Sequence, residues 1–120
     1  MASILIADDS DAIRLVLRDI LEIGKHIVAG DAIDGADAVE KYSQLKPDLM
    51  LLDLAMPKKD GLAVIQEIIE VDPKAKIILV TAADNIKIID KCLASGAKSY
   101  IAKPFEFKQV LKIIDETLKK

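Results

Sequence analysis

The sequence has few of the features that mark secreted, membrane-spanning or nucleic-acid-binding proteins. It contains a single cysteine, Cys92, among 120 residues, so no disulfide can form within the chain, which fits a reducing compartment. No apolar run approaches the roughly 18 residues of a membrane span, and residues 1–3 lead into an apolar segment without a signal peptide. A net charge of −3 offers no basic excess for nucleic acid. We therefore expect a cytoplasmic protein that binds neither membranes nor nucleic acid.

What the chain does have is a globular composition with an uneven distribution of charge. Hydrophobic residues make up 52% and charged residues 31% of the sequence, which is typical of one folded domain. Residues 1–60 carry 12 acidic and 7 basic side chains, a net of −5, whereas residues 61–120 carry 8 and 10, a net of +2. The first half therefore suggests a cation site and the second a face for an acidic partner, although ordinary solvated surface explains the charges equally well.

Short apolar runs alternate with segments of helical periodicity along the whole chain. Four continuous runs predict buried parallel strands at residues 4–7, 49–52, 77–80 and 100–102, and a weaker run at 27–29 predicts an edge strand. Apolar residues three and four apart predict the helices. Their stripes are Ile13, Val16, Leu17, Ile20 and Leu21; Ala38, Val39, Tyr42 and Leu45; Leu62, Ile65, Ile68 and Ile69; Ile86, Ile89 and Leu93; and Phe107, Val110, Leu111, Ile114 and Leu118.

This order, (βα)₅, predicts an α/β fold: a doubly wound open parallel sheet with helices on both faces. The chain shows no linker, internal repeat or low-complexity tract. We expect residues 1–120 to form a single domain.

Polar side chains follow the predicted strands at the points where the strands end. Asp8 and Asp9 follow the first strand, Asp53 the third, Thr81 the fourth and Lys103 the fifth. The carboxyl ends of parallel strands share one edge of the sheet, where α/β proteins bind ligands. Three carboxylates need a counter-charge, and Mg²⁺ suits them because it prefers oxygen ligands. A carboxylate can also accept a phosphoryl group, which a lysine and a hydroxyl can hold.

Each of these residues also has an ordinary structural explanation. Asp9, Ser10 and Asp11 are all good N-cap residues for the helix that follows, and we expect Ser10 or Asp11 to fill that position. Asp53 could merely begin a turn before Met56-Pro57, Thr81 could cap the next helix, and Lys103 could be a solvated strand end. Singly these explanations are as good as the functional one, but chance does not readily place all of the polar residues on one edge.

At these residues the sequence resembles the receiver domain of two-component response regulators over its full length. The matching segments are Asp8-Asp9-Ser10, the stretch DLAMPKKDG that begins at Asp53, Thr81-Ala82 and Lys103-Pro104-Phe105. The resemblance implies a flavodoxin-like fold with strand order 2-1-3-4-5 and a cis Lys103–Pro104 peptide. It also implies that the protein is a phosphoacceptor for signalling and catalyses only its own phosphorylation and dephosphorylation.

The resemblance further assigns roles to residues. Asp53 would accept the phosphoryl group from a histidine kinase, with Thr81 and Lys103 holding its oxygens. Mg²⁺, or Mn²⁺ as a substitute, would be bound by Asp8, Asp9, Asp53 and the backbone carbonyl of Ala55. On phosphorylation Thr81 would move toward the phosphate and Tyr100 would turn inward.

The resemblance also implies how the signal leaves the protein. We expect no output domain, and therefore a stand-alone monomer that signals by protein contact. The predicted partner face comprises Tyr100, Lys87, Lys91, Lys98, Lys108 and Lys112. Its cations favour an acidic amphipathic helix of the partner. The Ser10…Arg14 pattern and the ending SYIAKPF resemble chemotaxis regulators, which implies a flagellar motor or adaptor protein as the output partner, and a phosphatase as a further one.

Two positions depart from the usual family pattern. Ala55 and Ala83 stand two residues after Asp53 and Thr81, where polar side chains often tune hydrolysis of the phosphoryl group. Alanine cannot position a water molecule, so rapid self-dephosphorylation is not expected. Lys58 and Lys59 add positive charge after Asp53, which either aids docking of an acidic donor or is simply solvated.

Other functions remain open at this stage. A phosphorelay intermediate would share the same core residues. An aspartate-nucleophile phosphohydrolase is disfavoured because Asp53 is followed by Leu54 and Ala55 rather than by a second aspartate two residues on. A flavodoxin-like cofactor binder is disfavoured because Asp8 and Asp9 would repel a phosphate group. An interaction module that is never phosphorylated is a fourth possibility. We predict a core position for the Cys92 thiol and a surface loop for His26, with no functional role for either.

Overall fold

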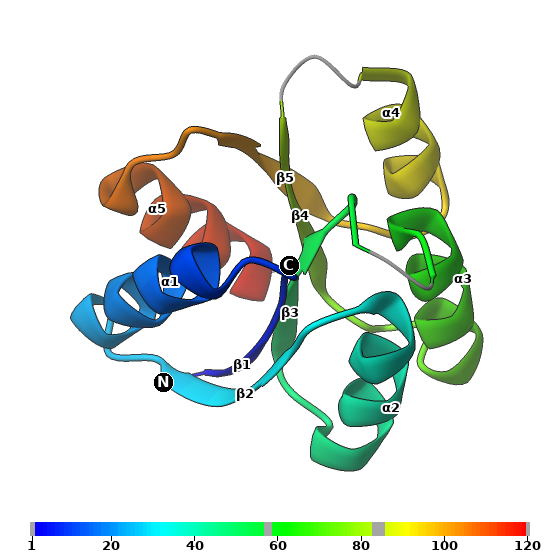
Figure 1. The fold of residues 1–120 in the computed structure, drawn as a ribbon, viewed down its shortest axis with the longest axis horizontal. Coiled ribbons are helices and arrows are strands. Elements are labelled where there is room, and N and C mark those ends of the chain that lie inside the picture. The colour runs from blue at the N-terminus through cyan, green and yellow to red at the C-terminus, as the bar shows by residue number, and fades with distance from the viewer. Residues whose placement is uncertain (1, 57–58, 83–85, 120) are drawn as a thin grey trace.

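A computed structural model describes residues 2–56, 59–82 and 86–119 of the protein. Within them, five parallel strands form one sheet in the order β2-β1-β3-β4-β5, which confirms the predicted doubly wound, flavodoxin-like arrangement (Figure 1). The strands are β1 (Ser3–Ala7), β2 (Ile27–Ala32), β3 (Leu49–Asp53), β4 (Ile77–Ala82) and β5 (Ser99–Lys103).

A helix follows each strand, and the helices cover both faces of the sheet. They are α1 (Asp11–Ile23), α2 (Gly35–Leu45), α3 (Gly61–Val71), α4 (Ile86–Ala94) and α5 (Phe107–Leu118). Helices α1 and α5 lie against one face, and α2, α3 and α4 lie against the other (Figure 1). This layering buries the strands from both sides, which explains why their sequences are continuously apolar rather than alternating.

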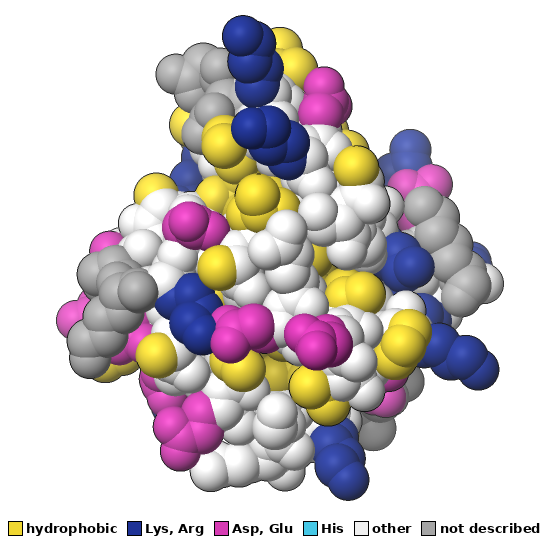
Figure 2. Space-filling model, turned by 90° about the vertical axis from the view of Figure 1, so that its right-hand side faces the viewer, with side chains coloured by type: hydrophobic (Ala, Val, Ile, Leu, Met, Phe, Trp, Pro, Cys, Tyr) yellow, Lys and Arg dark blue, Asp and Glu magenta, His cyan; other side chains and the backbone are white. Residues whose placement is uncertain are grey.

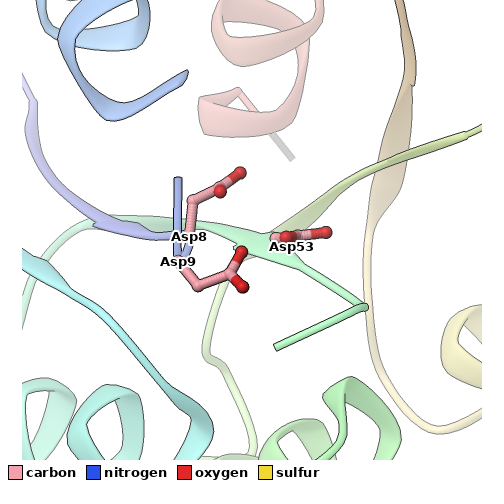
Figure 3. Close-up of side chains that lie close together, drawn as sticks. All are labelled: Asp8, Asp9 and Asp53. Carbon is pink, nitrogen blue, oxygen red and sulfur yellow. The ribbon is translucent and has the colours of Figure 1, made fainter. Parts of the chain in front are cut away.

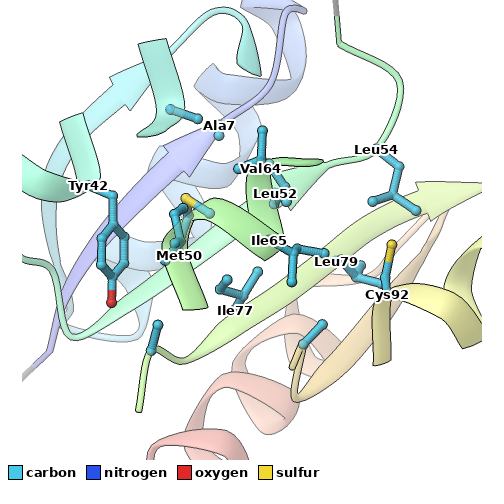
Figure 4. Close-up of a cluster of buried hydrophobic side chains, with 14 of the residues drawn as sticks. Ala7, Tyr42, Met50, Leu52, Leu54, Val64, Ile65, Ile77, Leu79 and Cys92 are labelled. Atoms are coloured by element: carbon cyan, nitrogen blue, oxygen red, sulfur yellow. The ribbon is translucent and has the colours of Figure 1, made fainter. Parts of the chain in front are cut away.

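The core divides into two clusters, one on each side of the sheet. In the cluster of Figure 4, Met50 and Leu52 of β3 and Leu79 of β4 lie among side chains from α2, α3 and α4, including Ile65. Each fully buried Leu or Ile side chain contributes roughly 1.5–3 kcal/mol relative to an exposed one. Cys92 is fully buried in this cluster, as predicted.

The described strands extend further than the predicted ones. Strand β2 continues through Gly30 to Ala32, because its register with β1 pairs Leu5 with Gly30 and Ala7 with Ala32 despite the lower apolar content. Asp53 and Lys103 are the last residues of β3 and β5, and Thr81 lies inside β4. The strand backbone itself, rather than a following loop, therefore fixes these three side chains.

Some predicted core positions are wrong. Val16, Ile86 and Phe107 belong to apolar helical stripes, yet their exposed fractions are 46%, 64% and 45%. Ile86 and Phe107 are the first residues of α4 and α5, and Val16 lies beside the buried Leu17 on α1. His26 lies in the loop between α1 and β2, as predicted, but its side chain is only 8% exposed rather than at the surface. Its Nδ1 accepts a hydrogen bond from the Ala2 N–H, and its Nε2 lies 3.4 Å from Asp115.

Two further features bear on the sequence predictions. The Lys103–Pro104 peptide is cis, as the resemblance implied. Across the described ranges, no helix combines the length and apolar character that a membrane span needs.

Candidate functional site

The turn after β1 presents two adjacent carboxylates in different environments. Asp8 is 1% exposed, and its Oδ1 accepts a hydrogen bond of 2.9 Å from the Ser10 N–H, whereas Asp9 is exposed. The Ser10 hydroxyl in turn accepts from the Ile13 N–H at 3.3 Å and caps α1, as predicted. Since Ser10 fills the N-cap position, neither Asp8 nor Asp9 is needed there. Their side chains lie at the carboxyl-end edge of the sheet (Figure 3).

Asp53 completes an acidic cluster at this edge. It ends β3, is 5% exposed, and lies beside Asp8 and Asp9 in Figure 3. One carboxylate oxygen from each of Asp8, Asp9 and Asp53 lies within 4.8 Å of the others. We call these three residues the acidic cluster.

Lys103 provides the positive charge that faces the acidic cluster. Its Nζ lies 3.4 Å from Asp8 Oδ2 and 3.6 Å from Asp53 Oδ1. One ammonium therefore bridges two of the three carboxylates at distances longer than a good charge-assisted hydrogen bond of about 2.8 Å. The cluster keeps an excess of negative charge.

The environment of Asp53 raises the pKa of its carboxyl above the usual value. Burial is the main cause, and the neighbouring charges of Asp8 and Asp9 act in the same direction. The Ala55 N–H, which donates to Asp53 Oδ1 at 3.2 Å, and the Lys103 ammonium oppose the increase. Asp53 is thus a more basic carboxylate than an exposed aspartate.

The acidic cluster fits a divalent cation. It joins three hard oxygen ligands within bonding reach of one ion, and among the described residues it is the one group of three or more metal-ligating side chains this close together. Within 4 Å, the Lys103 ammonium contacts two of the three carboxylates, so the acidic cluster has room for a further counter-charge. Mg²⁺ suits such a set because it uses few carboxylates and keeps several water ligands.

Thr81 and Ala55 border a hollow next to the acidic cluster. Thr81 is 5% exposed and pairs in register with Ala102, so its neighbour Ala82 pairs with Lys103. The hollow, of about 340 Å³, is lined mainly by apolar groups: Leu54, Ala55, Asp60, Gly61, Leu62, Thr81 and Ile88. Ala55 is exposed there and offers no polar side chain. The predictions for Ala83 and Lys58 fall outside the described residues.

Two glycines at helix starts pack closely against residues near Asp53. A Cβ on Gly35, the first residue of α2, would lie 2.1 Å from the carbonyl oxygen of Lys59, an approach that only glycine permits. A Cβ on Gly61, the first residue of α3, would lie 2.4 Å from a Leu54 side-chain carbon, which would have to shift. The Lys59 ammonium, for its part, pairs with Glu67 of α3, so it is engaged in the fold rather than simply solvated.

The predicted partner face is exposed. Tyr100 on β5 is 43% exposed, and all five predicted lysines are exposed, at Lys87 and Lys91 on α4, Lys98 before β5, and Lys108 and Lys112 on α5. Basic side chains gather at the top of the face shown in Figure 2, over α4. The sheet ends at β5, which α4 and α5 flank (Figure 1), so these residues form one side of the molecule.

Sequence reasoning missed one contact of the site. The guanidinium of Arg14 donates to the backbone carbonyl of Asp8 and pairs with Asp11 and Asp31. The spacing of Asp11 and Arg14, three residues apart on a helix, was a visible signal for the first pair. The contacts with Asp8 and Asp31 depend on the sheet order and had no local signal.

The fold and the site together define an α/β protein with a buried carboxylate in an acidic cluster at the carboxyl ends of its strands. Residues 4–115 match the family model described as "Response regulator receiver domain". The chain belongs to this family, and it is CheY-like.

Individual relatives agree with the family match along most of their length. The chemotaxis protein CheY of Thermotoga maritima is 39% identical over 116 residues, which cover 97% of each chain. Protein CcdB of Bacillus subtilis is 39% identical over 118 residues, which cover 98% of each. A chain in the crystal structure of the CheX–CheY–BeF3–Mg²⁺ complex from Borrelia burgdorferi superposes with a TM-score of 0.94 at 32% identity, covering 98% of this chain and 90% of that one.

Proposed function

We propose that this protein accepts a phosphoryl group on Asp53 from a histidine kinase and passes the signal on by protein contact, in the control of chemotaxis. The observation that carries the proposal is the position of Asp53, a buried carboxylate within 4.8 Å of two further carboxylates and 3.6 Å from the Lys103 ammonium. Membership of the receiver family and the resemblance to chemotaxis proteins support it.

The chemistry follows from the charges around Asp53. A carboxylate oxygen of Asp53 forms a bond to phosphorus while the bond from phosphorus to the donor's imidazole nitrogen breaks, and that nitrogen leaves with the bonding pair. Held by Asp8, Asp9, Asp53 and the backbone carbonyl of Ala55, Mg²⁺ or Mn²⁺ would neutralise charge on the transferring group.

Lys103 and Thr81 would bind the phosphoryl oxygens. The Lys103 ammonium already bridges Asp8 and Asp53, so it is placed to exchange a carboxylate contact for one to a phosphoryl oxygen. Thr81 lies on the neighbouring strand at the border of the hollow and carries a hydroxyl that can donate. A move of Thr81 toward the phosphate, with Tyr100 turning inward from its exposed position, would change the partner face.

The hollow beside Ala55 bears on how long the phosphoryl group persists. Ala55 is exposed and carries no group that could orient an attacking water molecule. We therefore propose slow self-dephosphorylation, with a partner phosphatase supplying the missing polar group. The exposed cations and Tyr100 supply the contact face for an acidic output partner such as a flagellar motor or adaptor protein.

The proposal can be tested with a small phosphodonor. Wild-type protein incubated with acetyl phosphate and Mg²⁺ should gain the mass of one phosphoryl group in intact mass spectrometry. Asp53→Ala should gain none, and Asp19→Ala, which removes an exposed carboxylate on α1, should be labelled like wild type. Unlabelled wild type, or undiminished labelling of Asp53→Ala, would refute the proposal. Many turnovers of phosphate release would instead favour a phosphohydrolase.

A further inference from the structure

Arg14 joins three elements around the turn that carries Asp8 and Asp9. Its side chain is only 12% exposed although it is a cation. One terminal nitrogen donates a hydrogen bond of 2.6 Å to the backbone carbonyl of Asp8, the other pairs with Asp11 at the start of α1, and Nε lies 3.3 Å from Asp31 Oδ2 on β2. A side chain with so many contacts is fixed in place.

The carbonyl that Arg14 binds belongs to the peptide unit that links Asp8 to Asp9. The Asp8 carboxylate has further contacts, with the Ser10 N–H at 2.9 Å and with Lys103 at 3.4 Å. The exposed Asp9 carboxylate has no hydrogen bond or ion pair within the described part of the chain. The position of Asp9 therefore depends on its backbone, and Arg14 holds that backbone.

The guanidinium is itself held in place from outside the turn. Asp31 accepts Arg14 through Oδ2 and the Arg18 guanidinium through Oδ1, the latter at 3.0 Å. A guanidinium has its donors in a rigid planar fork, so fixing one edge against Asp31 fixes the direction of the donor to Asp8. A lysine at this position offers one nitrogen and cannot reproduce the fork.

We propose that Arg14 is a positioning residue for the cation site: it fixes the Asp8–Asp9 peptide so that both carboxylates are presented to one divalent ion. This inference rests on the proposed function, which assigns the ion to these residues. Residues that orient metal ligands from outside typically affect metal affinity by about 10–100-fold.

Positioning and simple electrostatics predict opposite results when Arg14 is replaced. Removing a positive charge close to the acidic cluster would tighten binding of a cation if charge alone mattered. Loss of the contact to the Asp8 carbonyl should instead weaken binding. The sign of the change in affinity therefore distinguishes the two effects.

The experiment is a Mg²⁺ titration by calorimetry, together with acetyl phosphate labelling at increasing Mg²⁺. In Arg14→Met we expect the dissociation constant for Mg²⁺ to rise by about tenfold, while the labelling rate at saturating Mg²⁺ stays within about twofold of wild type. Arg18→Met is the matched control: it removes the same charge and also touches Asp31, but does not contact Asp8. Its affinity for Mg²⁺ should be unchanged or slightly tighter.

Arg14→Lys keeps the test valid if Arg14→Met does not fold. If only charge matters, the dissociation constant for Mg²⁺ should not change in Arg14→Lys. If positioning matters, it should rise by about threefold, which is less than the rise of about tenfold expected for Arg14→Met. Unchanged or tighter binding in the folded Arg14 variants would overturn the inference while leaving the proposed function intact, provided wild type is labelled. If wild type neither binds Mg²⁺ nor becomes labelled, both fail together.

Discussion

The two edges of the sheet differ in the partners that their polar side chains have. At the amino ends of the strands, several polar groups have short hydrogen bonds: Asp48 accepts from the Ser3 N–H at 2.8 Å, the Tyr42 hydroxyl donates to Asp72 at 2.9 Å, and Lys76 donates to a backbone carbonyl at 2.9 Å. At the carboxyl ends, three carboxylates lie together, and one ammonium contacts two of them at 3.4 and 3.6 Å. These groups of the first edge are paired by hydrogen bonds, whereas the second edge gathers carboxylates around a single cation.

The two edges also differ in the size of their hollows and in the charges beside them. A hollow of about 700 Å³ lies at the amino-end edge, among groups such as His26, Tyr42 and Asp72 that already have partners. The hollow beside Ala55 and Thr81 is about 340 Å³, yet it adjoins the unbalanced charges. Cavity size alone would point to the amino-end edge, whereas the grouped carboxylates point to the carboxyl-end edge, where we propose the reaction.

Replacing one lysine at each edge should give the largest contrast. Lys103→Met should slow labelling of Asp53 by about 10²-fold, because one preorganised charge that stabilises the transferring group is lost. Lys76→Met removes an ammonium that donates to the Leu118 carbonyl at the other edge and should leave labelling unchanged. The rate of labelling with acetyl phosphate is measured for both variants. Equal rates would contradict the proposed difference between the two edges.

Adding Mg²⁺ should stabilise the protein through the carboxyl-end edge alone. At a concentration 100 times the dissociation constant, binding to the folded state should raise the free energy of unfolding by about 2.7 kcal/mol. Urea unfolding with Mg²⁺ and with chelator measures this increment. Asp9→Ala should lose most of it because Mg²⁺ affinity falls sharply, while Asp48→Ala should keep it. An undiminished increment in Asp9→Ala would remove Asp9 from the cation site.

Removing a partnered group at the amino-end edge should cost stability without affecting labelling. Tyr42→Phe deletes the hydrogen bond from the buried tyrosine to Asp72 and should lower the free energy of unfolding by about 1 kcal/mol. Burial, together with this bond and the charge of Asp72, raises the pKa of Tyr42 above its ordinary value. Chemical denaturation should therefore show a less stable Tyr42→Phe variant, while the labelling assay should show the rate of wild type. Slower labelling of this variant would show that the two edges are coupled.

The smallest expected effect concerns pH and the charge on Asp53. Folding raises the pKa of the Asp53 carboxyl above its ordinary value of 3.8, so ionisation of this carboxyl disfavours the folded state. The protonated carboxyl contributes its full stability below pH 3.8, and this contribution is lost as the pH rises through the pKa of the folded state. Without metal, Asp53→Asn should be more stable than wild type at neutral pH. That advantage should shrink as pH falls toward 3.8. Urea unfolding across this range measures it, and a pH-independent difference would contradict the assigned cause.

Much of the fold, and the grouping of most residues of the candidate site at one edge of the sheet, could be predicted from the sequence. Continuous apolar runs gave the strands, and the polar residues that follow Ala7, Leu52 and Val80 marked the site edge because parallel strands end together. The strand order itself came from resemblance to the receiver family, since apolar periodicity does not specify which strands are neighbours.

What could not be predicted depends on contacts between distant segments. The extension of β2 to Ala32 is set by pairing with β1, and the burial of His26 is set by Ala2 and Asp115. The contact of Arg14 with the Asp8 carbonyl needs both the turn geometry and Asp31 on a neighbouring strand. Helical periodicity gave the buried faces but not their margins, so Phe107 was misplaced.

The positions of the two tyrosines have a spectroscopic consequence. The chain contains no tryptophan, so its ultraviolet emission comes from Tyr42 and Tyr100. Tyr42 is 6% exposed and hydrogen-bonded to Asp72 at the amino-end edge, whereas Tyr100 is 43% exposed on β5, three residues before Lys103. The protein thus carries two built-in optical probes: Tyr42 should report whether the chain is folded, and Tyr100 would report phosphorylation if it turns inward as proposed.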